Sequence, residues 1–328
     1  MRAIVIPEVG GPDVLTLRTL PNPQPGALQV SIRVLYTSVN YMDIMARQRG
    51  YRIERFPFVP GLEVAGYIHQ LGERVEGLRI GQPVAAFVQS GGYAELALAE
   101  AKLTIPLEGP HGQLDLATAA AFPMAATTAY DTLVNVARLR PGETVLIHAA
   151  AGGVGSLAGQ LARLLGAGRV LGTVGSAEKI AFARSSGYEQ IFLRDGFVES
   201  VRAVTEGRGV DIVLDAAGEP TRSQSLSLLA PGGRLVNFGN ASGNPDVPVA
   251  PATLLAGNKG ILGYSFGALR QDKPEHLVAT ARQTIDLCKT GQVHLAIAAT
   301  LPLEQATLAH QMMESHATSG KLLLQVQL

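Results

Sequence analysis

The sequence predicts an α/β protein built on a doubly wound parallel sheet, and three features indicate this fold. Residues 145–165 have the pattern of a short strand, a turn of small residues and an amphipathic helix. From residue 169 to residue 238, apolar strands alternate with helical stretches, as in a parallel sheet covered on both faces. The first third of the chain has many short strands separated by glycine turns, which is typical of a small barrel or sandwich.

The turn after the strand at 145–147 has the spacing of a dinucleotide-binding loop. Ala150, Gly152 and Gly155 stand where the motif G-x-G-x-x-G has its glycines, with alanine in the first place. Such a turn presents free backbone N–H groups and a positive helix end to a pyrophosphate. A glycine triplet alone is weak evidence and is better explained by a plain tight turn. Its place between a strand and a helix favours dinucleotide binding, with Gly153 and Val154 in the same loop.

Composition and charge argue against several classes of protein. The chain has 328 residues, of which 47% are hydrophobic, and its formal net charge is zero. We find no Lys/Arg-rich run, so we expect no nucleic-acid partner. The single cysteine, Cys288, permits neither a disulfide framework nor a four-cysteine zinc lobe. We also find no signal peptide before the first strand and no membrane-spanning apolar run, so we expect a cytoplasmic protein.

The remaining elements follow from the same patterns. Strands in the first third are expected at 2–6, 28–34, 64–68, 83–87 and 93–98. A helix is expected at 117–136, interrupted near Pro123. The middle third should then alternate strands at 169–174, 190–193, 210–215 and 234–238 with helices at 177–185, 197–205 and 222–229. A last strand at 261–266, a helix at 275–291 and a closing strand at 321–326 complete the chain.

The end of the second strand of the sheet, at residues 173–176, bears on cofactor choice. An NAD-preferring site places a carboxylate there to accept from the ribose 2′-OH, and this stretch has none. Gly175, Ser176 and Lys179 instead offer open N–H groups, a hydroxyl and an ammonium, which suit the 2′-phosphate of NADPH. Ser176 could equally be a helix cap and Lys179 a solvated charge. Glu178 would repel the phosphate if it turned inward.

The chain resembles the zinc-independent quinone oxidoreductases (the zeta-crystallin branch) of the medium-chain dehydrogenase/reductase superfamily. The resemblance covers essentially the whole length and is most specific at residues 39–43, 148–155, 172–179 and 237–240. It implies a GroES-like β-barrel catalytic domain at 1–118, a Rossmann domain at 119–262 and a return to the catalytic domain at 263–328. It also implies a homodimer, with the nicotinamide in the cleft between domains.

Zinc is not expected, because the ligands of the related alcohol dehydrogenases are missing. At the places that match their Cys and their Gly-His-Glu, this chain has Ser38 and residues 61–63, in which Leu62 replaces the histidine. Without a Lewis acid, the activity should be reduction of an electron-poor acceptor. Glu63 is then expected to be a hydrogen-bonded structural carboxylate.

The resemblance also supplies residue roles. Asn40, Asp43 and Tyr51 are the expected catalytic residues: Asn40 and Tyr51 could donate to the acceptor carbonyl, and Tyr51 could deliver a proton. Alternatively, Asn40 and Asp43 only cap a helix, and Tyr51 is an exposed loop aromatic. Further cofactor contacts are expected from Thr128, Arg194, Phe238, Gly239, Asn240, Phe266 and Lys321.

Two departures weaken the expected phosphate contacts. Leu193 stands where the family often has a tyrosine, although the neighbouring Arg194 could partly replace it. His316 stands where some relatives have an arginine, and Lys321 either compensates or is a strand-edge charge. His148 is expected to be a packed strand-end residue and not a base.

Three hypotheses on function follow. The first is an NADPH-dependent, zinc-independent reductase of quinones or α,β-unsaturated carbonyls. The second is an enoyl-thioester reductase, whose substrate tail would need basic residues such as Arg47, Arg49, Arg52 and Arg55. The third is a non-catalytic, crystallin-like protein that binds NADPH. The physiological acceptor cannot be read from the sequence.

Overall fold

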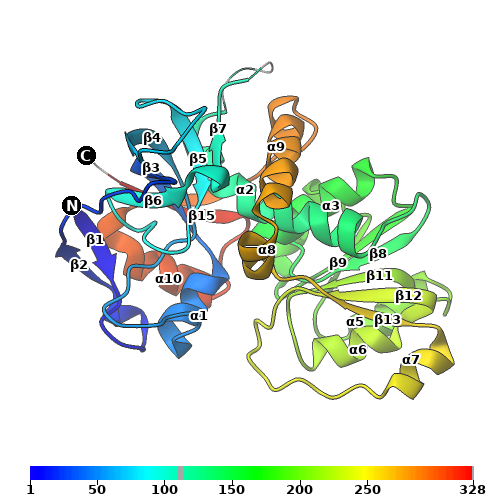
Figure 1. Ribbon diagram of the computed structural model, residues 1–328. Coiled ribbons are helices and arrows are strands. Elements are labelled where there is room, and N and C mark those ends of the chain that lie inside the picture. The colour runs from blue at the N-terminus through cyan, green and yellow to red at the C-terminus, as the bar shows by residue number, and fades with distance from the viewer. Residues whose placement is uncertain (110–111, 113, 327–328) are drawn as a thin grey trace. The chain divides into compact units, whose positions relative to one another are not determined.

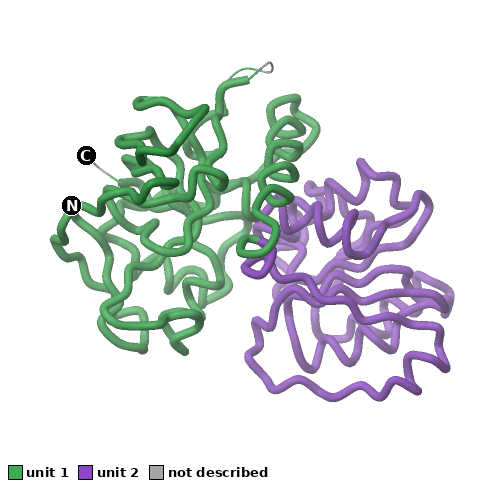
Figure 2. Tube along the Cα trace, viewed as in Figure 1, with its two compact units in different colours: residues 1–124, 270–328 green, residues 125–269 purple. Residues whose placement is uncertain are grey.

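The computed structural model describes residues 1–109, 112 and 114–326, and the chain divides into two compact units (Figure 2). Unit 1 consists of Met1–Met124 and Arg270–Leu328, and unit 2 of Ala125–Leu269. The expected boundaries lay after residues 118 and 262. The observed ones fall inside the helices α2 (Leu116–Asp131) and α8 (Phe266–Asp272). Within the described ranges, no helix combines the length and the apolar character needed to cross a bilayer.

Unit 1 contains a seven-stranded, mainly antiparallel sheet and a separate two-stranded ribbon (Figure 1). The path through the large sheet is β14-β15-β3-β4-β5-β7, and β6 also pairs with β3. The ribbon is β1 (Arg2–Val5) with β2 (Thr16–Thr19). The strands of the large sheet are β3 (Gln29–Val39), β4 (Glu63–Leu71), β5 (Pro83–Phe87), β6 (Leu96–Glu100), β7 (Thr104–Pro106), β14 (Ile297–Pro302) and β15 (Lys321–Gln325).

The core of unit 1 explains why its two sequence segments fold together. Val30, Ile32 and Val34 on β3 are fully buried and pack in one cluster with Leu322 and Leu324 of β15. The helices of the unit are α1 (Tyr41–Arg49), α9 (Pro274–Lys289) and α10 (Ala306–Glu314), with 3₁₀ turns η1 (Pro12–Val14), η2 (Ala101–Leu103) and η5 (Leu303–Gln305). We did not predict β14 or α10.

Unit 2 contains a six-stranded, fully parallel sheet in the order β10-β9-β8-β11-β12-β13, and the predicted doubly wound sheet is confirmed. The helix α3 lies over one face, and α5 and α6 lie over the other (Figure 1). The strands are β8 (Thr144–Ile147), β9 (Arg169–Val174), β10 (Gln190–Leu193), β11 (Val210–Asp215), β12 (Leu229–Asn237) and β13 (Gly260–Gly263). The helical segments are α3 (Gly153–Leu164), α4 (Ile180–Ser185), α5 (Phe197–Val204), α6 (Thr221–Ser227), α7 (Pro251–Gly257), η3 (Thr132–Val136) and η4 (Ala177–Lys179).

Two sequence-based expectations about element bounds are wrong. The helix α2 continues through Pro123 without interruption, because its alanine-rich neighbours are buried and the helical φ suits proline. Proline supplies no N–H, and the next N–H group, of Met124, donates to Glu63 Oε2 at 2.9 Å. The last strand of the parallel sheet ends at Gly263, so Phe266 begins α8 instead of ending a strand.

Candidate functional site

The turn between β8 and α3 is shaped by backbone contacts that only glycine permits. Ala149 has a φ of 53°, and Gly152 caps α3 in an extended conformation. A Cβ atom on Gly155 would lie 2.2 Å from the carbonyl oxygen of Ala149. In the described structure, no group accepts from the N–H of Gly153, Val154 or Gly155. These free donors at the start of a helix form a site suited to an anion.

The side chains that pack behind this turn are buried and held by hydrogen bonds. His148 is buried, and its two ring nitrogens hydrogen bond to Thr173 Oγ1 at 2.8 Å and to Ser225 Oγ at 2.7 Å. Burial, together with the nearby Arg194, lowers the pKa of His148 to about 3. Tyr188 donates to the carbonyl oxygen of Gly155 at 2.6 Å. The expectation that His148 is a packed strand-end residue is therefore confirmed.

Two cations gather at the carboxyl end of β9. Arg194 lies over Gly175, since a Cβ there would be 2.7 Å from its Nη2 atom. Burial and the nearby Arg194 both lower the pKa of Lys179, and Glu178 opposes this shift. Glu178 is fully exposed, and its pKa is lowered mainly by a hydrogen bond with the Ser176 side chain. The end of β9 is thus cationic, with one carboxylate at its margin.

A cavity of about 500 Å³ continues from Arg194 along the carboxyl edge of the parallel sheet. It is lined by the loops that follow β10, β11 and β12, including Glu219, Thr221, Ser242 and Asn244. Ligands of doubly wound folds bind at this edge of the sheet. The cavity therefore has the place and the polar lining expected for the adenosine end of a dinucleotide.

The loop after β12 is held by its own hydrogen bonds. Asn240 Oδ1 accepts from Ser242 and Gly243, and its Nδ2 donates to the carbonyl of Asn244. The carbonyl of Gly239 accepts from the Arg222 guanidinium at 2.7 Å. These groups, with Phe238 before them, fix the backbone at the edge of the sheet.

The residues on α2 and α8 that were expected to contact the cofactor have buried side chains. The hydroxyl of Thr127 is buried without a partner, whereas the Thr128 side chain hydrogen bonds with Tyr264. Phe266 is also buried, at the start of α8.

A buried polar cluster lies in unit 1, at the ends of β3, β4 and β15. Strand register builds it, since Leu322 pairs with Val39 and Thr37 with Val64. Lys321 Nζ lies 2.7 Å from Asn40 Oδ1 and 3.1 Å from Glu63 Oε1. Lys321 is only 5% exposed, so its interpretation as a strand-edge charge is wrong.

Glu63 is the centre of this cluster. Its Oε1 atom accepts from Ser38 Oγ at 2.5 Å and from Asn40 Nδ2 at 3.2 Å, and its Oε2 atom accepts from the N–H of Met124. Glu63 is hydrogen-bonded as expected, and its assignment as a structural carboxylate instead of a catalytic one stays a prediction. Leu62 next to it can bind no metal. Among the described residues, no group of three His, Cys, Asp or Glu side chains could hold a metal ion.

Asp43 occupies the first turn of α1. Its carboxylate accepts from the N–H of Asn40 at 2.9 Å and from the N–H of Gly61 at 2.9 Å. Burial raises the pKa of Asp43 to about 6, against the effect of these hydrogen bonds and of Lys321. Asp43 therefore ties α1 to the segment before β4, and it forms a capping box with Asn40.

Tyr51 follows the glycine that ends α1 and is 40% exposed, with the Arg52 guanidinium 5.4 Å from its ring centre. Arg49 and Arg55 are also exposed, whereas Arg47 is fully buried. Arg47 donates to His310 and to the carbonyl of Gly10 and pairs with Glu314. It cannot reach a substrate tail, so its assignment to one is wrong. The local sequence Ala-Arg-Gln-Arg at 46–49 gave no sign that one arginine was internal.

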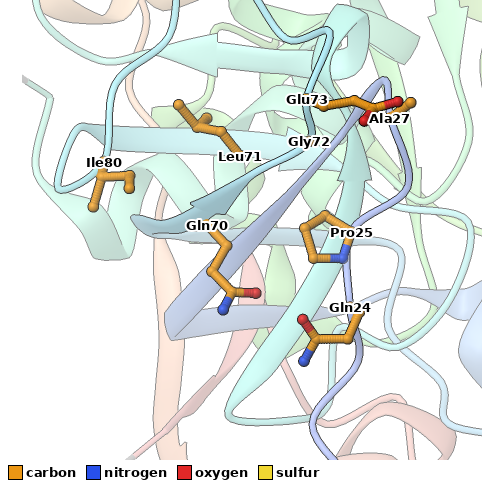
Figure 3. Close-up of a pocket in the computed structure, with 8 residues that line it drawn as sticks. All are labelled: Gln24, Pro25, Ala27, Gln70, Leu71, Gly72, Glu73 and Ile80. Carbon is orange, nitrogen blue, oxygen red and sulfur yellow. The ribbon is translucent and has the colours of Figure 1, made fainter.

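A separate hollow of about 450 Å³ lies at the other end of β4, around Gln70, Leu71 and Gly72 (Figure 3). Gln24 and Pro25 face it from the loop before β3. Glu63 begins β4 and Leu71 ends it, so this hollow is distant from the polar cluster on the same strand.

Comparison with known proteins agrees with this architecture. Residues 26–109 match the alcohol dehydrogenase GroES-like domain, and residues 153–283 match the zinc-binding dehydrogenase family. The chain is 35% identical to a quinone oxidoreductase of Pseudomonas aeruginosa, over 96% of each protein. It is 32% identical to a 2-haloacrylate reductase of a Burkholderia species, over 98% of each.

Solved structures give the same result. The Escherichia coli quinone oxidoreductase complexed with NADPH superimposes with a TM-score of 0.91 at 28% identity, over 99% of this chain and 100% of that one. The expected family resemblance, the GroES-like domain and the oxidoreductase class are confirmed. This chain belongs to the quinone oxidoreductases of the medium-chain dehydrogenase/reductase superfamily.

Proposed function

We propose that this oxidoreductase uses NADPH to reduce quinones or α,β-unsaturated carbonyl compounds by hydride transfer without zinc. The observation that carries the proposal is the Lys321–Glu63 ion pair, with an N–O distance of 3.1 Å. A zinc ion beside this carboxylate would be repelled by the ammonium, and Ser38 and Leu62 supply neither thiolate nor imidazole. The donor set therefore does not suit zinc. Acceptors that need little polarisation fit such a site best.

The nucleotide site in unit 2 supports the choice of cofactor. Bound NADPH would supply the hydride. The free N–H groups of Gly153, Val154 and Gly155 would bind its pyrophosphate, and Lys179 and Arg194 would bind its 2′-phosphate. Since neither cation forms an ion pair within 4.0 Å in the described structure, both remain available to an anion. Glu178 weakens this site and limits the expected preference over NADH.

In unit 1, we assign Asn40 as the donor to the oxygen of the acceptor, where negative charge develops during hydride transfer. Tyr51, exposed on its loop, would deliver the proton that completes the reduction. Asp43 would hold the start of α1, and thereby Asn40, in place. Thr128, the loop of Phe238, Gly239 and Asn240, and Phe266 would contact the cofactor.

The test is NADPH and NADH oxidation with a panel of quinones and enones, measured on protein of known metal content. We expect turnover with at least one class of acceptor, and a kcat/KM about tenfold or more higher with NADPH, since a charge-assisted contact contributes roughly 1.5–3 kcal/mol. Tight NADPH binding without oxidation by any acceptor would instead indicate the non-catalytic, crystallin-like role.

A second class of acceptor is an alkene that bears an acidic or thioester group. The 2-haloacrylate reductase among the relatives acts, by its name, on a small unsaturated acid. Arg49, Arg52 and Arg55 are exposed around Tyr51 and could bind such a charge or the phosphates of a thioester tail. Crotonyl-CoA and 2-chloroacrylate in the same panel separate these substrates from quinones.

We also propose a homodimer that forms through the free edge of the parallel sheet. The strand β13 is the last strand of that sheet (Figure 1). Leu262 on this strand and Leu255 on α7, which precedes it in the chain, are 37% and 79% exposed. An unpaired strand edge beside exposed apolar side chains fits a second copy of the same edge. Light scattering after gel filtration should give twice the chain mass, and a monomer would refute the proposal.

A further inference from the structure

We propose that Lys321 is a positioning residue that polarises the Asn40 amide and so strengthens the N–H group that Asn40 offers to the acceptor oxygen. This inference rests on the proposed function, in which Asn40 binds that oxygen. In this arrangement, the buried ammonium of Lys321 supplies the electrophilic stabilisation that a metal ion would otherwise supply. It acts on the acceptor through the Asn40 amide.

The orientation of the Asn40 amide follows from hydrogen-bond chemistry. An ammonium group is a donor only, so the Asn40 atom that lies 2.7 Å from Lys321 Nζ must be the oxygen. The Asn40 nitrogen is then directed to Ser38 Oγ at 3.1 Å and to Glu63 Oε1 at 3.2 Å. The lysine thus selects one of the two possible orientations of the amide.

This arrangement leaves one Asn40 hydrogen without a described acceptor. Ser38 Oγ and Glu63 Oε1 are themselves only 2.5 Å apart. Seen from the Asn40 nitrogen, the two acceptors are separated by a far narrower angle than the two hydrogens of a planar amide. One hydrogen must therefore be shared between them, and the second points away from both. That second N–H group is the donor that we assign to the acceptor oxygen.

The charge distribution strengthens this donor. Lys321 is 5% exposed and Glu63 is 1% exposed, so little water screens the ammonium. A cation that binds the amide oxygen draws electron density from the amide nitrogen and makes its N–H a stronger donor. Glu63 balances the charge and accepts the shared hydrogen, so it holds the amide plane. The cluster therefore offers a preorganised donor where negative charge develops.

The same contacts argue against a direct role of Lys321 in binding a cofactor phosphate. Its ammonium already meets Asn40 and Glu63, and the carbonyl of Val39 lies 3.5 Å away. A phosphate could reach it only if this buried ion pair were broken, which would leave a buried charge unpaired. We therefore expect changes at Lys321 to act on the rate of reduction and not on NADPH affinity.

The first experiment compares kcat, KM and the NADPH dissociation constant in variants of the whole protein. Lys321→Met alone leaves Glu63 unpaired, so Lys321→Met/Glu63→Gln removes both charges together. We expect kcat with a quinone to fall about tenfold or more in both variants, with the NADPH dissociation constant changed by less than about twofold. Lys321→Arg should recover part of kcat. Lys289→Met is the matched control, because Lys289 also binds a backbone carbonyl in unit 1.

A double-mutant cycle with Asn40→Ala tests whether Lys321 acts through the amide. In the Asn40→Ala background, Lys321→Met should lower kcat no further. If the two effects multiply, or if NADPH affinity falls with kcat in folded Lys321→Met/Glu63→Gln, the inference is wrong. Melting temperatures identify any variant that has lost its fold.

A spectroscopic readout separates this inference from the proposed function. The side-chain amide of Asn40, assigned in asparagine-labelled protein by its loss in Asn40→Ala, should shift upfield in its proton resonance in Lys321→Met/Glu63→Gln and remain unshifted in Lys289→Met. An unshifted resonance in the first variant overturns the inference. This measurement needs no acceptor, so it remains decisive if wild-type protein reduces none of the compounds and the proposed function fails.

Discussion

The nucleotide turn of unit 2 and the polar cluster of unit 1 are built in opposite ways. The turn consists of backbone: N–H groups, a helix start and glycines whose missing side chains leave space. The cluster consists of side chains, with Lys321, Glu63, Asn40 and Ser38 within hydrogen-bond distance of one another. A backbone site should fail when a side chain is added, whereas a side-chain site should fail when one is removed.

The largest effect should come from adding one methyl group to the turn. Gly155→Ala would place a Cβ atom 2.2 Å from the Ala149 carbonyl oxygen, which is too close without a backbone shift. We expect a loss of about 1–3 kcal/mol in the free energy of unfolding and at least tenfold weaker NADPH binding, since about 1.4 kcal/mol is tenfold. Denaturant titration and fluorescence titration measure the two effects.

Gly11→Ala is the control for this change, since no atom lies within 4 Å of its added Cβ and its φ is −68°. We expect it to keep wild-type stability and affinity. If Gly155→Ala binds NADPH as tightly as Gly11→Ala does, the turn is not the pyrophosphate site.

The next effect concerns the cations at the end of β9. Lys179→Met/Arg194→Met should raise the KM for NADPH about tenfold or more and leave the KM for NADH within about twofold, because only NADPH carries the 2′-phosphate. Steady-state kinetics with both nucleotides measure this difference. Arg202→Met, at an exposed position on α5, is the matched control. An equal loss with both nucleotides would contradict the proposed role.

A smaller effect is a pH dependence that the two units share. His148 in unit 2 and His310 in unit 1 are both buried, and burial lowers both pKa values from 6.5 to about 3. Their neutral forms stabilise the fold fully above pH 6.5. As pH falls below that value, these histidines become protonated in the unfolded chain but stay neutral in the folded protein. The folded state therefore loses stability.

Each of these histidines should contribute about 1.4 kcal/mol per pH unit to the slope below pH 6.5. His148→Gln should therefore lose stability less steeply on acidification than wild type, as urea unfolding between pH 7 and pH 5 would show. His69→Gln, at an exposed position, should keep the wild-type slope. Equal slopes in all three proteins would show that His148 is not held neutral.

The smallest effect is expected at Glu178, whose side chain is fully exposed. Glu178→Gln removes a negative charge beside the Ser176 hydroxyl and should raise the NADPH preference over NADH by roughly twofold. The effect should weaken as salt is added, because exposed charges are screened. An unchanged or lower NADPH preference in Glu178→Gln would show that this carboxylate does not repel the phosphate.

The two regions also differ in how far the sequence could predict them. Ala150, Gly152 and Gly155 lie within one turn, so their spacing, together with the strand before them and the helix after them, was enough to predict a nucleotide turn and the fold that carries it. The contact of Lys321 with Asn40 joins residues 281 positions apart and depends on the register of β15 against β3. No local sequence pattern predicts that register. The residues were therefore predicted individually, and their cluster was not.

Burial explains the other failures of the sequence-based predictions. Arg47 and Arg49 look alike in sequence, yet only Arg47 is enclosed, because α10 supplies His310 and Glu314 as its partners. A proline usually ends or interrupts a helix, but the buried alanines around Pro123 keep α2 intact. In both cases, tertiary contacts outweigh the local signal.

The most direct test of the central claim is turnover against metal content. We would measure NADPH oxidation with 1,4-benzoquinone before and after exhaustive treatment with a zinc chelator, with zinc determined by elemental analysis of the same samples. The account predicts unchanged kcat in protein that holds far less than one zinc per chain. Activity that disappears with the metal and returns with added zinc would contradict it.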